Sequence, residues 1–546
     1  MRVVDAIAEI MKREGVEVLV AYPVNPLIEA AAAADIRTII VRQERTGIHM
    51  VDAISRLTSG KKVGVFCCQN GPGAENAFGG IAQAYSESVP MVFIPAGYGR
   101  NINQVFPNFN SALNYRHVTK WSEQLTTAAA LPGAMRRAFT QARNGRPGPT
   151  MLEVPGDLWR EEVEIGDYVP TQRVRFAPDS TDVARAAQAL ADAQRPVLYA
   201  GQGVHYAEAW DELKELAELL ECPVTTSLEG KSAFPEDHPL SLGSGGRAMP
   251  EQVWRFVTDA DVIFAVGASM SRTGFGIQLP RGKTYVHNTI DPVDLNKDMP
   301  TQYPLVGDSK LTLQALNAEL RERLAGRPRG KTQQVNAEIT KVKAGWMEKW
   351  TPKLFSDETP ISPYRVVWDL LRTVDVRNTI ITHDAGSPRD QLSPFWESTV
   401  PLSYVGWGKT TQLGYGLGLA MGAKLAHPDK TCINVWGDAA IGMTGMDFET
   451  AARERIPILS VLMNNFSMAI ELPVMPISTE KYRSTDISGN YADFATALGG
   501  YGERVTSPDQ IIPAINRGLQ ANAEGKPALL EFITQKETAI SAYGRG

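Results

Sequence analysis

Short apolar runs alternate with helix-like segments along almost the whole chain, and this alternation restricts the fold more than any other feature. In the first 160 residues the runs are VEVLVAYP, RTIIV, KKVGVFCCQ, VPMVFIPAG and PTMLEVP. Amphipathic or small-residue segments separate them. Runs of this kind are typical of parallel strands, which are buried on both faces and are joined by helices. The sequence therefore predicts an α/β fold.

Two segments interrupt the alternation and divide the 546 residues. The polar stretch 166–180 contains proline and is predicted to be a linker. The charged stretch 325–360 lacks strand-like runs and is predicted to be a second linker that contains one exposed helix. We therefore expect three doubly wound domains, at 1–165, 180–325 and 360–546, each a mostly parallel sheet flanked by helices.

The composition narrows the class of protein. Hydrophobic residues make up 43% and charged residues 21%, as in globular proteins. A net charge of −6 without a dense Lys/Arg tract argues against nucleic acid or an acidic membrane as partner. The 4 cysteines form no disulfide framework and are expected to be buried thiols in a reducing compartment. With no signal-like start and no apolar run of about 18 residues, we expect a cytoplasmic enzyme that acts on a small molecule.

Polar residues end two apolar runs in the stretch GDAAIGMTGMDFETAARERIPILSVLMNN, residues 437–465. Asp438 and Asn465 are 465 − 438 = 27 residues apart, about what one strand–helix–strand crossover requires. Both side chains would then lie at the carboxyl edge of one parallel sheet, where ligands bind. A carboxylate, an amide and a nearby carbonyl are oxygen ligands that suit Mg²⁺, and a diphosphate completes the coordination. A helix beginning near Ala440 would direct its N–H groups to the same anion.

This stretch resembles the signature of the thiamine-diphosphate-dependent enzymes, in which Gly-Asp, a helix and Asn-Asn occur in this order. The resemblance implies that Asp438 and Asn465 bind Mg²⁺ through their side chains and Ser467 through its carbonyl. Ala439 replaces the glycine that is commonest at its position. The other motif residues that would contact the cofactor are Gly437, Ala439 and Ala440.

A second stretch, VRQERTGIHMVDAISRLTSGKKVGVFCCQNGPGAENAFGGIAQAY at 41–85, resembles the pyrimidine-binding half of the same enzymes. Glu44 occupies the position of the glutamate whose carboxylic acid bonds the aminopyrimidine and drives it to the imino tautomer that cofactor activation needs. The loop that follows would contribute cofactor contacts from Gly71, Gly73 and Asn76. In this family the cofactor lies between the first domain of one chain and the third of another, so the resemblance implies a homodimer or homotetramer.

A third stretch, 408–430, resembles the small-residue helix that precedes the metal motif. Leu413 matches the bulky apolar residue that supports the bent cofactor beneath its thiazolium ring. An ordinary core leucine is the alternative. The resemblance therefore covers nearly the whole chain.

The substrate-side motifs favour one branch of the family. AIGMTGMDFETAARERIP and NAFGGIAQA look more like 2-hydroxyacyl-CoA lyases and oxalyl-CoA decarboxylases than like acetolactate synthases. The first hypothesis is therefore a lyase that cleaves a 2-hydroxyacyl-CoA to formyl-CoA and an aldehyde or ketone, or runs the reverse acyloin condensation. The alternative is an acetolactate-synthase-like carboligase or a 2-oxo acid decarboxylase. A non-catalytic homologue is a third interpretation, which the retention of all three key polar residues disfavours.

Three polar residues are candidates for the substrate cavity, and two of them, Asn25 and Glu471, are peculiar to this chain. Asn25 lies in YPVNP, where the family has a Gly-rich loop, and is assigned to the cofactor site. Glu471 follows the metal motif and would shuttle a proton to the substrate if burial raises its pKa. Tyr115 would line the same cavity. The structural alternatives are a turn residue, a surface carboxylate and a packed aromatic ring.

The middle domain is a candidate nucleotide site. Gly201 and Gly203 would permit close approach to a diphosphate, and three arginines would pair with phosphates, Arg247, Arg272 and Arg281. The sequence leaves open whether this site binds the ADP portion of CoA, FAD or no ligand at all. The C-terminal tail QKETAISAYGRG is expected either to close over the active site or to fray, and the sequence does not distinguish the two.

Overall fold

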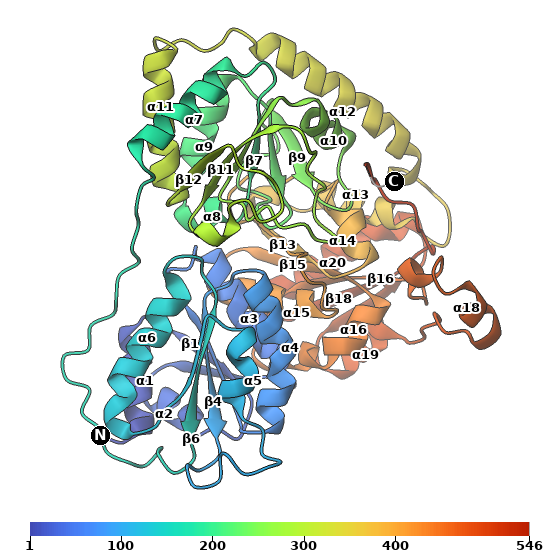
Figure 1. Cartoon of the computed structure of the whole chain (residues 1–546). Helices are drawn as coiled ribbons and strands as arrows, with labels where there is room; N and C mark the ends of the chain where they lie inside the picture. Colours follow the sequence, from blue (N-terminus) through green and yellow to red (C-terminus); the bar gives the residue numbers. More distant parts are fainter. Residues whose placement is uncertain (545–546) are drawn as a thin grey trace.

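The computed structural model describes residues 1–544 and contains three six-stranded sheets, each flanked by helices (Figure 1). Neighbouring strands in all three sheets are parallel over these residues. The predicted α/β architecture is confirmed.

The first and third sheets have the same topology. Their strand orders are β2-β1-β3-β4-β6-β5 and β14-β13-β15-β16-β18-β17, so each is the same permutation of six consecutive strands. The strands of the first sheet are β1 (Val18–Ala21), β2 (Arg37–Ile40), β3 (Gly64–Cys68), β4 (Met91–Gly97), β5 (Trp121–Gln124) and β6 (Pro149–Pro155). Those of the third are β13 (Thr379–His383), β14 (Tyr404–Val405), β15 (Thr431–Gly437), β16 (Leu459–Asn464), β17 (Tyr501–Val505) and β18 (Ala528–Ile533).

The middle sheet is built differently. Its order is β12-β11-β10-β7-β8-β9, the arrangement of dinucleotide-binding folds. Its strands are β7 (Val197–Ala200), β8 (Val224–Ser227), β9 (Ser241–Gly245), β10 (Val262–Val266), β11 (Thr284–Thr289) and β12 (Tyr303–Val306). The strand order reverses between β7 and β10 here and between β13 and β15 in the third sheet. Ligands of open parallel sheets bind at such reversals, beyond the carboxyl ends of the strands.

Helices cover both faces of each sheet. Those of the first domain are α1 (Val3–Arg13), α2 (Leu27–Ala33), α3 (Glu44–Leu57), α4 (Pro72–Ser86), α5 (Ser111–Asn114) and α6 (Leu131–Arg143). Those of the middle domain are α7 (Ser180–Asp192), α8 (Gly203–Ala207), α9 (Trp210–Leu220), α10 (Glu251–Asp259) and α11 (Ser309–Arg323). Those of the third are α13 (Pro363–Thr373), α14 (Ser387–Leu392), α15 (Tyr415–Ala426), α16 (Asp438–Thr444), α17 (Phe448–Arg453), α18 (Pro476–Tyr482), α19 (Tyr491–Ala497) and α20 (Ile511–Ala523).

Helices α3 and α15 join the first and third domains within one chain, and they pack together over most of their length. Gly422 lets the two backbones approach, because a Cβ there would lie 2.1 Å from the Met50 carbonyl oxygen. Beside this contact, Arg56 binds Asp52 in a buried ion pair of 2.6 Å. The Tyr415 hydroxyl donates to the same carboxylate. This packing fixes the two domains against each other.

Helix α12 (Thr332–Leu354) forms the second linker, and it runs along the outside of the middle and third domains (Figure 1). One face is buried rather than exposed, through Trp346 and Trp350. The Trp346 indole donates to Ser541 at 2.8 Å, and Ser541 in turn donates to the Met249 carbonyl at 2.7 Å. The C-terminal tail thus packs on α12 and the middle domain.

The four cysteines are free and buried, as expected. Within residues 1–544, no helix combines the length and the apolar content that crossing a bilayer requires.

Candidate active site

A cavity opens at the carboxyl edge of the third sheet, beyond the ends of β13, β15, β16 and β18. Its lining includes eight of the residues predicted for the cofactor or substrate: Leu413, Gly437, Asp438, Ala439, Ala440, Asn465, Ser467 and Glu471. Further lining residues include Phe275, Gly386, Pro388, Gln391, Met463, Met468, Ile470 and Gln535. The strand-end residues of the metal motif therefore meet at one site, as the 27-residue spacing predicts.

Asp438 begins α16 and is buried. Its two oxygens accept hydrogen bonds from three backbone N–H groups, those of Ala439 at 2.9 Å, Asn465 at 3.2 Å and Ser467 at 3.1 Å. Burial raises the pKa of Asp438 to about 6, although these bonds oppose the rise. The carboxylate is thus held rigidly in a place where its charge is poorly solvated, which suits a cation ligand.

Asn465 and Ser467 each bring a buried oxygen that lacks a hydrogen-bond partner within residues 1–544. These atoms are the side-chain Oδ1 of Asn465 and the Oγ of Ser467. Buried polar atoms of this kind are rare unless a ligand, a water or an ion satisfies them. Together with the Asp438 carboxylate and the Ser467 carbonyl, these two atoms form an all-oxygen set, so the residues present fit Mg²⁺.

A buried carboxylate that sequence analysis missed supports this loop. Glu531 on β18 accepts from the Asn464 amide at 2.7 Å and from the Arg504 guanidinium at 2.9 and 3.0 Å. It also accepts from the backbone N–H groups of Tyr491 at 3.2 Å and Ala492 at 3.0 Å. Asn464 precedes the predicted metal ligand Asn465, so Glu531 fixes the start of the metal loop.

A second missed carboxylate, Asp384, holds the loop that carries Leu413. It accepts from the backbone N–H groups of Ala385 at 2.8 Å, Gly414 at 2.9 Å and Gly416 at 2.9 Å. Burial raises the pKa of Asp384 to about 6. Asp384 directly follows β13, so the strand-end argument that found Asp438 would have found it too.

Glu44 begins α3 and is 3% exposed. Asn76 donates to its carboxylate at 3.3 Å. Burial raises the pKa of Glu44. The neighbouring loop turns at Gly71, where φ is +62° and a Cβ would lie 2.7 Å from the Tyr98 hydroxyl. Gly73, in the first turn of α4, is buried against Cys68.

Within one chain, these first-domain residues do not reach the third-domain cavity. The described lining of that cavity begins at Phe275 and includes no residue of the first domain. The structure therefore holds two partial sites, one around Glu44 and one around Asp438.

Comparison with known families matches all three domains. The model of the thiamine pyrophosphate enzyme N-terminal TPP binding domain matches residues 1–125. The central domain of the same enzymes matches 183–316, and their C-terminal TPP binding domain matches 384–532. The chain belongs to the thiamine-diphosphate-dependent enzymes.

Curated relatives of this thiamine-diphosphate-dependent enzyme match over nearly its full length. The probable acetolactate synthase large subunit of Methanocaldococcus jannaschii is 29% identical, over 99% of this chain and 93% of its own. The acetolactate synthase isozyme 3 large subunit of Escherichia coli is 28% identical, over 93% and 90%. The acetolactate synthase large subunit of Parasynechococcus marenigrum is 30% identical, over 94% and 85%. These names support the alternative hypothesis rather than the 2-hydroxyacyl-CoA lyase, which we do not carry further.

Two further predicted residues of the first domain, Tyr115 and Asn25, hydrogen-bond to backbone groups of their own domain. Tyr115 is fully buried in the core, where its hydroxyl donates to the Ala74 carbonyl and its ring packs against Phe78 and Phe93. Asn25 donates to the carbonyls of Cys68 at 2.9 Å and Ile94 at 3.2 Å, and accepts from the Leu27 N–H at 3.0 Å. Both side chains are thus engaged with backbone groups, and their roles in catalysis and cofactor binding stay predictions.

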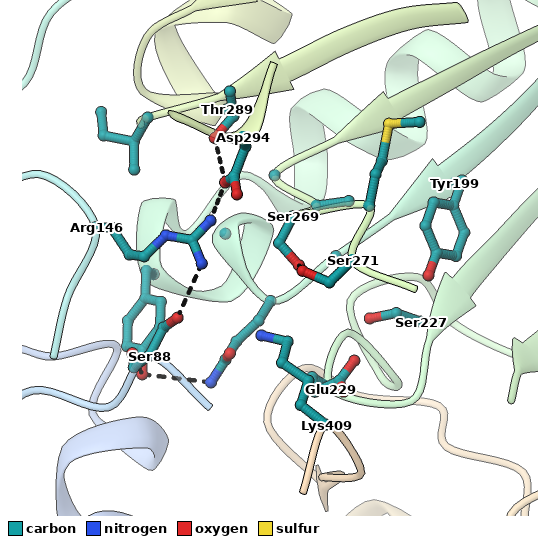
Figure 2. A pocket seen from close by; sticks show the side chains of 18 of the residues that line it. Ser88, Arg146, Tyr199, Ser227, Glu229, Ser269, Ser271, Thr289, Asp294 and Lys409 are labelled. Atoms are coloured by element: carbon teal, nitrogen blue, oxygen red, sulfur yellow. Dashed lines mark hydrogen bonds and ion pairs between the residues drawn. The ribbon is translucent and has the colours of Figure 1, made fainter. Parts of the chain in front are cut away.

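A second cavity lies at the strand-order reversal of the middle sheet (Figure 2). Residues of all three domains line it, including Ser88 of the first, Glu229 of the second and Lys409 of the third. In Figure 2 Arg146 bridges from the first domain to Asp294.

The predicted phosphate contacts of this second cavity are partly wrong. Gly201 and Gly203 do line it, but a Cβ at Gly201 would lie 2.4 Å from the Gly267 carbonyl oxygen, so backbone packing already requires that glycine. None of the three predicted arginines belongs to the described lining: Arg247 pairs with Asp390 at 3.6 Å, and Arg272 and Arg281 are exposed. The cations that line the cavity are Arg146, Arg173 and Lys409.

Proposed function

We propose that this enzyme breaks and forms the bond next to the carbonyl of a 2-oxo acid, as a carboligase or decarboxylase of the acetolactate synthase kind. The observation that carries the proposal is the oxygen donor set of Asp438, Asn465 and Ser467, gathered at the strand ends of a domain built to bind thiamine diphosphate. The printed names of the full-length relatives supply the substrate class.

In this proposal, residues of the third domain bind the metal and the cofactor, and Glu44 holds a proton. When bound, thiamine diphosphate supplies the electron sink that such bond cleavage requires. Asp438 and Asn465 would bind Mg²⁺ through their side chains and Ser467 through its carbonyl, and the metal would anchor the diphosphate. Leu413, held by Asp384, would support the cofactor from the cavity wall. Glu44 would hold a proton for the pyrimidine ring, because its burial favours the neutral carboxylic acid.

The active site would form between two copies of the chain. Glu44 does not line the cavity of its own third domain, so the cavity would be completed by Glu44 of the partner subunit. We therefore propose a homodimer or a larger homo-oligomer in which each chain contributes to two sites.

Three further assignments belong to this proposal. Glu471 lines the cavity and would exchange a proton with the substrate. The middle cavity would take a nucleotide, because it lies at the strand-order reversal of a dinucleotide-type sheet. A cytoplasmic location stays a prediction.

Product analysis by mass spectrometry tests the proposal. The purified chain, loaded with thiamine diphosphate and Mg²⁺, would receive pyruvate or a panel of 2-hydroxyacyl-CoAs. We expect CO₂ from pyruvate, together with acetaldehyde or a carboligation product, and untouched thioesters. Formyl-CoA from a thioester, with pyruvate unchanged, would overturn it.

A further inference from the structure

Glu471 places an unpaired carboxylate in the cofactor cavity. It ends the short 3₁₀ helix Ala469–Glu471 that follows the metal loop, and its side chain is half-buried. Its backbone N–H donates to the Met468 carbonyl at 3.0 Å. Among residues 1–544 its carboxylate forms no ion pair, and the hydrogen bond it accepts comes from its own backbone N–H, so it remains available to a ligand.

The cavity offers no positive side chain to balance this charge. Among the described lining residues, the only charged ones are Asp438, which belongs to the metal site, and Glu471. Burial has the largest effect on the pKa of Glu471 and raises it, whereas the backbone N–H of Glu471 and the charge of Arg247 lower it. Arg247 is also paired with Asp390, at 3.6 Å, and does not line the cavity.

Apart from Asp438, the other described lining residues of this cavity are uncharged, and polar ones such as Gln391 and Gln535 accompany the apolar ones. Phe275, Met468 and Ile470 line the same cavity. In such surroundings a second negative charge beside the Glu471 carboxylate is poorly screened and strongly disfavoured. A hydroxyl or another uncharged hydrogen-bond donor would instead satisfy the carboxylate, since charge-assisted hydrogen bonds are the strong ones.

We propose that Glu471 selects an uncharged acceptor that carries a hydrogen-bond donor, such as a hydroxyaldehyde, over a second 2-oxo acid. This inference rests on the proposed function. In the reaction, the donor 2-oxo acid loses its carboxylate as CO₂, and its former carbonyl carbon bonds to the carbonyl carbon of the acceptor. The acceptor oxygen takes up one proton and becomes a hydroxyl. Pyruvate and glycolaldehyde would thus give CO₂ and 3,4-dihydroxybutan-2-one.

Competition between acceptors tests the inference. The full-length holoenzyme receives pyruvate as donor and equal concentrations of glycolaldehyde, propionaldehyde and 2-oxobutyrate, and the products are quantified by mass spectrometry. Propionaldehyde replaces the hydroxyl of glycolaldehyde by a methyl group. We expect glycolaldehyde to be preferred over both by at least about tenfold, because a site built to bond a hydroxyl rejects analogues without it.

Two variants assign the preference to Glu471. In Glu471→Gln the product ratio of glycolaldehyde to 2-oxobutyrate should fall by at least about tenfold, because the negative charge is removed while the shape is kept. Glu480→Gln, on exposed α18, is the matched control and should keep the wild-type ratio. Calorimetric affinities for thiamine diphosphate with Mg²⁺ should agree among the three proteins, which excludes a cofactor defect.

The outcomes separate this inference from the proposed function. CO₂ release from pyruvate, measured with ferricyanide as oxidant and without acceptor, reports the proposed function alone. If CO₂ is released but 2-oxobutyrate is preferred, or if Glu471→Gln keeps the wild-type ratio, the inference is overturned and the function stands. If no 2-oxo acid releases CO₂, both are overturned.

Discussion

Glu531 on β18 accepts a hydrogen bond of 2.7 Å from the side-chain amide of Asn464, the residue before the metal-site Asn465. The same carboxylate is held by Arg504 and is fully buried. A rigid partner of this kind orients the ligands of a metal even though it does not touch the metal. The position of the metal loop therefore depends on a residue that lies 66 positions further along the chain (531 − 465).

Glu531→Gln should weaken Mg²⁺ binding by about 10- to 100-fold, the usual cost of removing such a supporting partner. The neutral amide cannot accept bonds from both Asn464 and Arg504 with the strength of a carboxylate. Calorimetric titration with Mg²⁺ and thiamine diphosphate measures the effect. Glu503→Gln is the control, because Glu503 binds Arg517 at the surface of the same sheet. Equal Mg²⁺ affinity in wild type and Glu531→Gln would refute the supporting role.

Asp384 should make the stability of the protein depend on pH. Its pKa is raised to about 6 in the folded state, above its ordinary value of 3.8. Because the folded protein holds this proton more tightly than the unfolded chain does, Asp384 contributes stability that is fully present below pH 4. This stability is lost as the pH rises through 6. The loss amounts to up to about 3 kcal/mol, at 1.36 kcal/mol per pKa unit.

Asp384→Asn removes this titration together with part of the bonding to Gly414 and Gly416. The variant should therefore be less stable than wild type at pH 4, and the difference should shrink as the pH approaches 7. Urea unfolding of the cofactor-free proteins, followed by tryptophan fluorescence at several pH values, measures it. A difference that stays constant from pH 4 to 7 would contradict the assignment to Asp384.

The sequence allowed prediction of the sheets and the metal motif because both depend on local patterns. Buried parallel strands are continuous apolar runs, and the polar residues that follow them lie at the same sheet edge. Asp438 and Asn465 were found in this way, and the cavity brings them together.

Long-range packing explains what the sequence does not reveal. The side chains of Tyr115 and Asn25 donate to backbone carbonyls distant in sequence, which no local pattern indicates. Glu531 sits inside an apolar strand, PALLEFIT, and its partners come from three other segments. The shared core of α3 and α15 likewise depends on contacts across more than 350 residues, as in the hydrogen bond between Arg56 and Tyr415.

Variants of Tyr115 distinguish a packing role from the predicted catalytic role. Tyr115→Phe removes one buried hydrogen bond to the Ala74 carbonyl and should cost about 1 kcal/mol of stability, with turnover within about threefold of wild type. Tyr115→Ala should cost about 3–5 kcal/mol, because it leaves a cavity beside Phe78 and Phe93. Chemical denaturation and pyruvate turnover, measured in parallel, give both quantities. A hundredfold loss of turnover in Tyr115→Phe at nearly wild-type stability would support the catalytic role.

Glu44→Gln should abolish most turnover while leaving the fold and cofactor binding intact. The amide matches the carboxylic acid in shape and still accepts from Asn76, but it cannot supply the proton that the pyrimidine ring requires. Loss of a positioned acid typically costs about 10²- to 10⁴-fold. Hydrogen–deuterium exchange at C2 of bound thiamine diphosphate, followed by NMR, should slow by a similar factor, and calorimetry should give nearly unchanged cofactor affinity. Glu164→Gln, which changes an exposed carboxylate near the end of the first domain, serves as the control. Rapid C2 exchange in Glu44→Gln would remove Glu44 from cofactor activation, because the cofactor would then be activated without its proton.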